Sequence, residues 1–581
     1  MLRLNKEVKK KTGRVYLTIR RGYRDENGRS RNKHIETIGY LDVLAKEYDD
    51  PIAHFEDVVK KRNEEEARTK TLTIEINTET KIEEDTPGSK NYGHIILSKI
   101  YHELEIDRFL NNKQRHANYK FNLEQIARLL IFSRILYPGS KLYTHKYILD
   151  KYFDNFRFTI DDIYAALDEF DHHSIELQQH LHENIVKQYG RVTDLIYYDV
   201  TNYYFEIDLE DDLRKRGPSK EKKRDPIVQM GLAVDSQSIP ISYHIYPGNT
   251  HDSETYLPQM AALKKKFHAK RIVVVADKGL NCGDNIAFNL ALGDGYIFSQ
   301  SIRNSCAELK QWVLDENGYD GAGDSRKKSR LIPVTINVTV KQTGKKKTKK
   351  KVPIDQKQIV FFSRKYADRT RYKRAEMLSK AADLISDPSK YDRAIHYGAT
   401  DYIMNLKIDK KTGKVIEPEQ LLCIDLEKVS EEEKYDGYYL IVTSEFDLPD
   451  DKVIEAYRGL WQIEESFKIT KSTLDARPVF LRNADHINAH FLICFVALLI
   501  LRLIEHRIDC KYRAARIVES LRKVTCSHVE ENLYMFTHYD EVVRYLEMVF
   551  GIELTKKYQT LGEIRSNLAA AKKNSKSVKF S

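Results

Sequence analysis

The chain has 581 residues, a net charge of +10 at pH 7 and 41% hydrophobic residues. This length predicts several domains rather than one core, and the hydrophobic fraction is that of a globular protein, not a disordered one. The six cysteines form no CxxC pair, which argues against a disulfide framework or a zinc knuckle and favours a reducing compartment.

The N-terminal region is strongly basic. Residues 1–34 hold twelve Lys/Arg against three Asp/Glu, and their alternating pattern predicts a β-hairpin with a basic tip. A polar helix is expected at 53–71, followed by a strand and linker over 72–91. Two further lysine-rich blocks lie at 341–351 and 571–581. Such blocks are usually solvated loops or tails, and the alternative is a polyanionic partner.

The middle of the chain changes from a helical to an alternating pattern. Between residues 93 and 190 the apolar residues recur at 3.6-residue spacing, which predicts helices. After Arg191 strands and helices alternate in the order βββαβαβ, which is the order of the ribonuclease-H-like fold. The expected strands are 195–206, 227–235, 241–249, 271–277 and 295–301, and the expected helices are 251–267 and 283–292.

The C-terminal half begins with short alternating runs over 304–434, which predict a mostly β insertion. The core is expected to resume with a strand at 436–445 and a long helix at 450–472. A second helix, 486–508, contains the apolar run FLICFVALLIL, which is too short to span a bilayer and indicates a buried helix. Shorter helices are expected over 511–548.

Two aspartates stand in or at the end of apolar strands. Asp199 lies within LIYYDVTNYYFE, and Asp277 ends RIVVVAD. Neighbouring strands would bring the two carboxylates together, where like charges repel unless a cation lies between them. Hard oxygen ligands without nearby Cys or His indicate Mg²⁺ or Mn²⁺. The alternative for each aspartate is a hydrogen bond to Thr201 or to a backbone amide.

A third acid is expected on the late helix. Tyr457, Trp461, Glu464, Phe467 and Lys471 recur at three- and four-residue steps and form one stripe. An acid on a stripe with two aromatic residues is expected to face the protein rather than water. The alternative is a surface ion pair of Glu464 with a lysine four residues on.

These residues together resemble a known family. The DVT at 199–201, the strand-terminal Asp277 and the spacing Tyr457-x6-Glu464-x6-Lys471 are similar to those of bacterial DDE transposases of the insertion-sequence-four superfamily, with their Y-R-E-K helix. The large insertion between the second and third acids also fits that family. One position departs, because the family arginine falls on Leu460, and Arg458 on the same helix is its candidate replacement.

The resemblance implies a function. Asp199, Asp277 and Glu464 would be the catalytic, metal-binding triad, holding two Mg²⁺ (or Mn²⁺) about 4 Å apart. They would nick the ends of a mobile element and join them to target DNA. Tyr457, Arg458 and Lys471 would contact DNA phosphate. The partners would be double-stranded DNA, both terminal inverted repeats and target, and a second copy in a homodimer, in the bacterial cytoplasm at the nucleoid.

The expected domain organisation follows chain order. It comprises a basic hairpin/helix region with linker at 1–91, a helical DNA-binding domain at 92–190, a ribonuclease-H-like core at 191–303 and 435–510, the insertion at 304–434, and a helical region with a basic tail at 511–581.

Two other functions stay open from the sequence. The first is a catalytically inactive DNA-binding repressor of transposition, and the second is a structure-selective nuclease on the same fold. Trp312 in the insertion is either a structural core residue or a platform for a displaced base.

Overall fold

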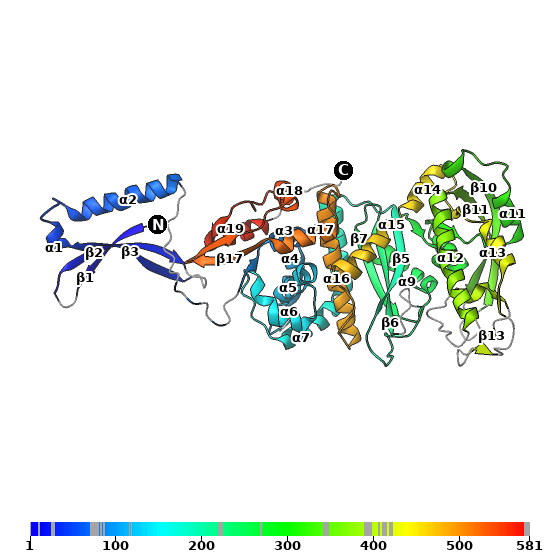
Figure 1. The fold of residues 1–581 in the computed structure, drawn as a ribbon, viewed down its shortest axis with the longest axis horizontal. Coiled ribbons are helices and arrows are strands. Elements are labelled where there is room, and N and C mark those ends of the chain that lie inside the picture. The colour runs from blue at the N-terminus through cyan, green and yellow to red at the C-terminus, as the bar shows by residue number, and fades with distance from the viewer. Residues whose placement is uncertain are drawn as a thin grey trace. The chain divides into compact units, whose positions relative to one another are not determined.

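The computed structural model describes most of the chain, and it shows a mixed α/β fold with one large mixed sheet and many helices (Figure 1). The described residues are 2–9, 12–24, 29–69, 79, 81, 84, 88–115, 117, 119–218, 225–267, 270–340, 348–387, 398–404, 407–408, 415–416 and 422–573. Most of the expected strand and linker at 72–91, the first seven residues of the lysine run 341–351 and the tail beyond Lys573 lie outside them.

The described chain divides into two compact units. One comprises the described residues within 1–103, 142–157 and 510–573, and the other comprises those within 104–141 and 158–509.

The first unit contains a three-stranded antiparallel sheet at the N-terminus. Its strands β1 (Leu2–Val8), β2 (Val15–Arg24) and β3 (Ser30–Tyr40) lie in that order, so the expected hairpin is β2–β3 and gains a third strand. The short helix α1 (Leu41–Leu44) follows, and α2 (Pro51–Thr69) packs on the sheet.

The C-terminal region contains helices, as expected, but it also contains three short strands that the sequence did not predict. Strands β17 (Thr525–Glu530), β18 (Leu533–Phe536) and β19 (Tyr558–Thr560) form a sheet with β4 (Lys90–Asn91). These strands are too short to show a period, and one partner comes from more than 400 residues away. The same unit holds α3 (His94–Glu103), α17 (Ala514–Lys523), α18 (Glu541–Phe550) and α19 (Leu561–Ala571).

The second unit has a helical layer packed around a buried helix. Helices α5 (Leu123–Leu136) and α7 (Ile160–His172) contact α16 (Ala484–Arg507), with α4 (Ile106–Arg115) and α8 (Ser174–Tyr189) beside them. By length and composition α16 could cross a membrane, but 94% of its apolar window is buried within the protein. It is the core helix that the sequence predicts.

An eight-stranded sheet forms the rest of this unit, in the order β10-β11-β16-β9-β8-β5-β6-β7. Strands β5, β8 and β9 are parallel, and every other neighbouring pair is antiparallel. The strand bounds are β5 Leu195–Tyr204, β6 Ile227–Asp235, β7 Pro240–Pro247, β8 Val273–Ala276, β9 Gly295–Gln300, β10 Lys327–Val340, β11 Thr348–Phe362 and β16 Tyr438–Thr443. Helices α9 (Asp252–Lys266) and α10 (Gly283–Ala291) cover one face through a core that includes Tyr256 and Phe298.

The insertion at 304–434 is not mostly β. Its long strands β10 and β11 extend the large sheet, but it also holds α11 (Ala307–Leu314), α12 (Arg364–Ser386) and α13 (Leu426–Glu433). Small strand pairs join β12 (Ile403–Met404) to β15 (Cys423–Ile424) and β13 (Lys407–Ile408) to β14 (Val415–Ile416). Helix α12 is mostly charged and buries few side chains, so its apolar period is weak in the sequence.

The expected long helix at 450–472 is divided into three pieces. Helix α14 (Asp450–Arg458) ends at Gly459, α15 (Trp461–Lys468) follows, and residues Ile469–Thr473 form a π-helical turn, η6. At the break the backbone hydrogen bond spans three residues, as in a 3₁₀ turn: the Leu460 amide donates to the Tyr457 carbonyl at 3.0 Å. Short 3₁₀ and π segments within helices often mark functional positions.

Candidate active site

Asp199 lies in β5, and Asp277 directly follows the last residue of β8, the parallel strand beside it. Tyr197 of β5 pairs with Val275 of β8, and Asp199 and Asp277 each follow two residues later. Neighbouring strands lie about 4.8 Å apart and side chains alternate with a period of two. The parallel register therefore places both carboxylates at the same level of the sheet.

Each aspartate accepts hydrogen bonds that hold its orientation. Asp199 Oδ1 accepts the backbone N–H of Val200 at 2.7 Å. Asp277 Oδ1 accepts the backbone N–H of Lys278 at 2.6 Å and the hydroxyl of Ser299 at 2.9 Å. Asp199 is half-buried and Asp277 is exposed. The backbone hydrogen bond of Asp199 is of the kind expected under the alternative to a metal site, in which the aspartate bonds to Thr201 or to a backbone amide.

Glu464 reaches the same place from α15. A cavity of about 500 Å³ is lined by Asp199, Asp277 and Glu464 together, and by Tyr457 and Leu460 of the same broken helix. The sequence analysis expected Glu464 to face the protein interior. In the structure Glu464 is exposed, and its side chain faces the open space of this cavity. The alternative, an ion pair of Glu464 with Lys468, does not form among the described residues, where Lys468 instead lies 3.6 Å from Glu465.

Buried contacts fix α15 over the sheet. Helix α15 packs against β5, and the hydroxyls of Tyr203 and Thr470 lie 2.7 Å apart. Arg502 of α16 donates to Ser466 Oγ at 2.8 Å and pairs with Glu505 at 2.8 Å. Arg502 is only 4% exposed, so this buried hydrogen bond anchors α15, the helix that carries Glu464, to α16.

Two hydroxyl groups lie beside the acids in this cavity. Tyr457 and Ser299 both line the acid-lined cavity, and the Ser299 hydroxyl donates to Asp277 Oδ1 at 2.9 Å. Burial raises the pKa of Tyr457, and the Asp277 carboxylate raises it further, so this phenol stays protonated at neutral pH. Tyr457 is therefore a hydrogen-bond donor in the cavity.

The wall formed by α12 is basic and aromatic. Arg369, Lys373 and Arg374 line the cavity, with Tyr366 beside them. Arg374 is buried and tied to Asp436. Arg369 and Lys373 are exposed, one helical turn apart, and have no ion-pair partner in the described part of the chain. The cavity that holds the three acids is thus also lined by two exposed cations of α12 with no ion-pair partner among the described residues.

The donor set fits a hard cation in kind. The cavity lining holds three carboxylates and neither His nor Cys, which suits Mg²⁺ or Mn²⁺ rather than zinc. Among the described residues, however, no three Asp, Glu, His or Cys side chains are already close enough to share one ion.

The other predicted residues lie elsewhere. Arg458 points away from the acids, with its guanidinium 5.5 Å from the centre of the Phe361 ring, and Leu460 lines the cavity in its place. Lys471 lies on η6 with its ammonium 5.4 Å from the ring centre of Tyr203. Trp312 is half-buried against a small core cluster, with the Arg330 guanidinium 4.3 Å from its ring centre.

The sequence did not single out Ser299 or the α12 cations. Ser299 lies in the strand GYIFSQS beside β8, so the neighbouring-strand argument that paired the aspartates could have found it. Nothing local marks Arg369 and Lys373, which are two of many exposed charges on α12.

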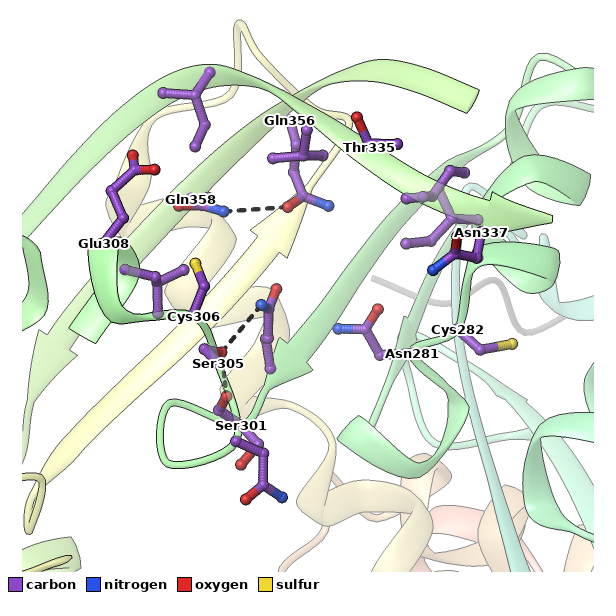
Figure 2. A pocket seen from close by; sticks show the side chains of 18 of the residues that line it. Asn281, Cys282, Ser301, Ser305, Cys306, Glu308, Thr335, Asn337, Gln356 and Gln358 are labelled. Atoms are coloured by element: carbon purple, nitrogen blue, oxygen red, sulfur yellow. Dashed lines mark hydrogen bonds between the residues drawn. The ribbon is translucent and has the colours of Figure 1, made fainter. Parts of the chain in front are cut away.

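A larger cavity of about 950 Å³ adjoins the acid-lined one and shares Lys278, Gln300 and Ser301 with it. Figure 2 shows amide side chains of this cavity, among them Gln358, which donates to Gln356 at 3.4 Å. Gln300 also lines the cavity and donates to Ser305 at 3.4 Å. Its one acid is Glu308, so it offers hydrogen-bonding groups but no carboxylate cluster.

Comparison with known proteins identifies the family. Residues 192–500, more than half of the chain, match the Transposase DDE domain family. Residues 3–72 match the N-terminal domain of IS1634 family transposases. No curated protein matches the chain. A solved piggyBac transposase synaptic complex with hairpin DNA matches at 8% identity and a TM-score of 0.35, covering 84% of this chain and 88% of that chain.

The chain belongs to the DDE transposase family. It is a DNA transposase of the bacterial insertion-sequence type, an enzyme whose family depends on divalent metal ions.

Proposed function

We propose that the acid-lined cavity is the catalytic centre of this transposase, with Asp199, Asp277 and Glu464 as the residues that bind two Mg²⁺ ions. Strands β5 to β9 and α15 would form a ribonuclease-H-like core of the insertion-sequence-four type. The observation that carries this proposal is the parallel register of β5 and β8, which sets two carboxylates side by side opposite a third.

In this proposal the side chains of the chain position the metal ions and the DNA. When bound, divalent ions would activate a water or a 3′-hydroxyl and stabilise charge on the phosphodiester. Asp199 in β5 and Asp277 at the end of β8 would supply two carboxylate ligands, and Glu464 of α15 would supply the third. Tyr457 would donate its phenolic hydrogen to a phosphate oxygen, since its raised pKa keeps it protonated. The enzyme would cut the element's ends and join them to target DNA.

The basic wall supplies the contacts that DNA requires. We assign phosphate contacts to Arg369 and Lys373, which have no counter-ion in the described chain. Lys471 lies on η6, after the helix of Glu464, and is assigned to a phosphate further along the strand. The proposed partners are terminal inverted repeats, target DNA and a second copy of the chain, in the bacterial cytoplasm.

The acids can be tested against a matched neighbour. Glu464→Gln is expected to lower Mg²⁺-dependent nicking of DNA carrying the element's ends by roughly 10³-fold or more, because the loss of metal binding removes several kcal/mol of transition-state stabilisation. Asp277→Asn should do the same. Glu465→Gln, one residue away and paired with Lys468, is the control and should stay near wild type. Equal activity of the Glu464 and Glu465 variants would end the assignment.

The basic wall has its own test. Each phosphate contact adds roughly −0.9 to the log–log slope of DNA affinity against salt. The double variant Arg369→Gln/Lys373→Gln should therefore flatten the slope by nearly two. Arg371→Gln is the control, because Arg371 is exposed on the same helix but paired with Asp368. A slope unchanged from wild type would show that α12 does not touch phosphate.

A further inference from the structure

A second, smaller cavity lies outside the proposed catalytic centre. It measures about 60 Å³ and lies where α5, the start of α6 (Lys141–Tyr147), the segment after η6 and α16 meet. Three nitrogen-bearing side chains line it, and each is almost fully buried: Arg134 is 6% exposed, Lys141 5% and His490 4%. One water needs roughly 10–15 Å³ of such space, so the cavity has room for a group of several heavy atoms.

The hydrogen bonds around this cavity leave cationic groups unsatisfied. Arg134 donates through Nη1 to the Asp475 carbonyl at 3.1 Å and through Nη2 to the Gly139 carbonyl at 2.8 Å. Its Nε is buried and has no hydrogen-bond partner. The Lys141 ammonium has no hydrogen bond or ion pair to any described residue. His490 Nε2 lies 3.2 Å from the carbonyl oxygen of Ala476.

A buried ammonium without a counter-charge is costly, and this cost lowers the pKa values of the basic groups in the cluster. Burial, and then the Arg134 charge, lower the pKa of Lys141 to about 7. Burial, Arg134 and Lys141 hold the pKa of His490 well below its usual range, and burial raises the pKa of the Cys494 thiol. The one carboxylate in the lining is Asp475, which is exposed at the rim. No buried anion balances the cluster among the described residues.

We propose that this cavity binds one phosphate-class oxyanion, held by Lys141 and Arg134 at its floor. The anion would supply the missing counter-charge and accept hydrogen bonds from Lys141 Nζ and Arg134 Nε. Phe480 also lines the cavity and is 68% exposed, so the cavity borders solvent and an anion can enter. The source is either free phosphate or a backbone phosphate of bound DNA, and the second source rests on the proposed DNA-binding function.

The test for free anion uses inorganic phosphate and no DNA or catalysis. Adding sodium phosphate, against sodium chloride at equal ionic strength, should raise the melting temperature of the full-length wild type. Lys141→Met should lose at least tenfold in phosphate affinity. Lys187→Met, at an exposed lysine in the same unit, should respond as wild type does. Asp475→Asn should bind phosphate more tightly, and its φ of +45° suits asparagine.

The second arm separates the two sources. If a DNA phosphate occupies the site, Lys141→Met should reduce the salt slope of DNA binding by about one. If free phosphate is the ligand, the slope stays unchanged while the phosphate-induced stabilisation is lost. The proposal is overturned if phosphate stabilises wild type and Lys141→Met equally, or stabilises neither while the DNA slope is also unchanged. Neither arm depends on the acids of the catalytic centre, so a failure here leaves that assignment intact.

Discussion

Gly459, at the break between α14 and α15, offers a sharp test of how the sheet positions the late helix. A Cβ added there would lie 2.0 Å from Tyr197 Oη, 2.6 Å from Tyr197 Cζ and 3.1 Å from the Ala456 carbonyl oxygen. Tyr197 is 3% exposed and precedes Asp199 by two residues on β5, so it has little freedom to move away. Gly459→Ala must therefore lift α15 from the sheet.

The expected cost of Gly459→Ala has two parts. Overpacking of this kind lowers the free energy of unfolding by about 1–3 kcal/mol, and two contacts below 3 Å place this case at the upper end. Activity should fall more than stability, because displacing a catalytic group by about 1 Å costs on the order of 10²-fold. Denaturant unfolding measures the first effect, and nicking of element-end DNA measures the second.

Gly562→Ala is the matched control. Gly562 lies in α19, and the nearest atom to an added Cβ is Thr560 Oγ1 at 3.8 Å. Alanine is the better helix former by up to about 1 kcal/mol, so this variant should be neutral or slightly more stable. Adding Tyr197→Phe to Gly459→Ala should restore only part of the loss, since Cζ remains. Wild-type stability and nicking in Gly459→Ala would refute the close approach.

Three further changes probe the rest of the fold. Arg191→Met should lower the free energy of unfolding by about 3–5 kcal/mol in denaturant titrations, because Asp235, 1% exposed and 2.8 Å from Arg191, loses its partner. Between pH 7 and 10.5, the ordinary pKa of lysine, Lys141 binds fewer protons in the folded protein than in the unfolded chain. The free energy of unfolding should therefore rise over that window by up to about 5 kcal/mol. Measured in chloride buffer, Lys141→Met should flatten this rise. Thr159→Ala removes the capping box with Asp162 and should cost about 1 kcal/mol by thermal melting; no loss would deny the cap a role in stability.

Local pattern was sufficient to predict the central strands of the large sheet. The period-two and continuous apolar runs placed β5, β6 and β8 within a few residues, because a strand's alternation is written into consecutive positions. The acids stood out because a carboxylate in an apolar strand is costly without a partner. Both arguments need only neighbours in the chain.

Contacts between distant segments escaped the sequence. The C-terminal sheet needs β4, whose pairing with β17 is set by no local period. The single long helix expected at 450–472 is broken because Gly459 meets Tyr197 from another element. Helix α12 looks like an ordinary solvated helix, and only the fold makes its cations part of the acid-lined cavity.

The sequence by itself determined which residues carry charge and where the central strands β5 to β9 lie, since those depend on residue type and spacing. Only the tertiary structure decided that Leu460 and not Arg458 lines the cavity, and that Lys141 is buried without a counter-ion. A helical turn spreads adjacent residues over about 100° each, so a small change in helix start or break redirects a side chain, and burial depends on every element packed around it.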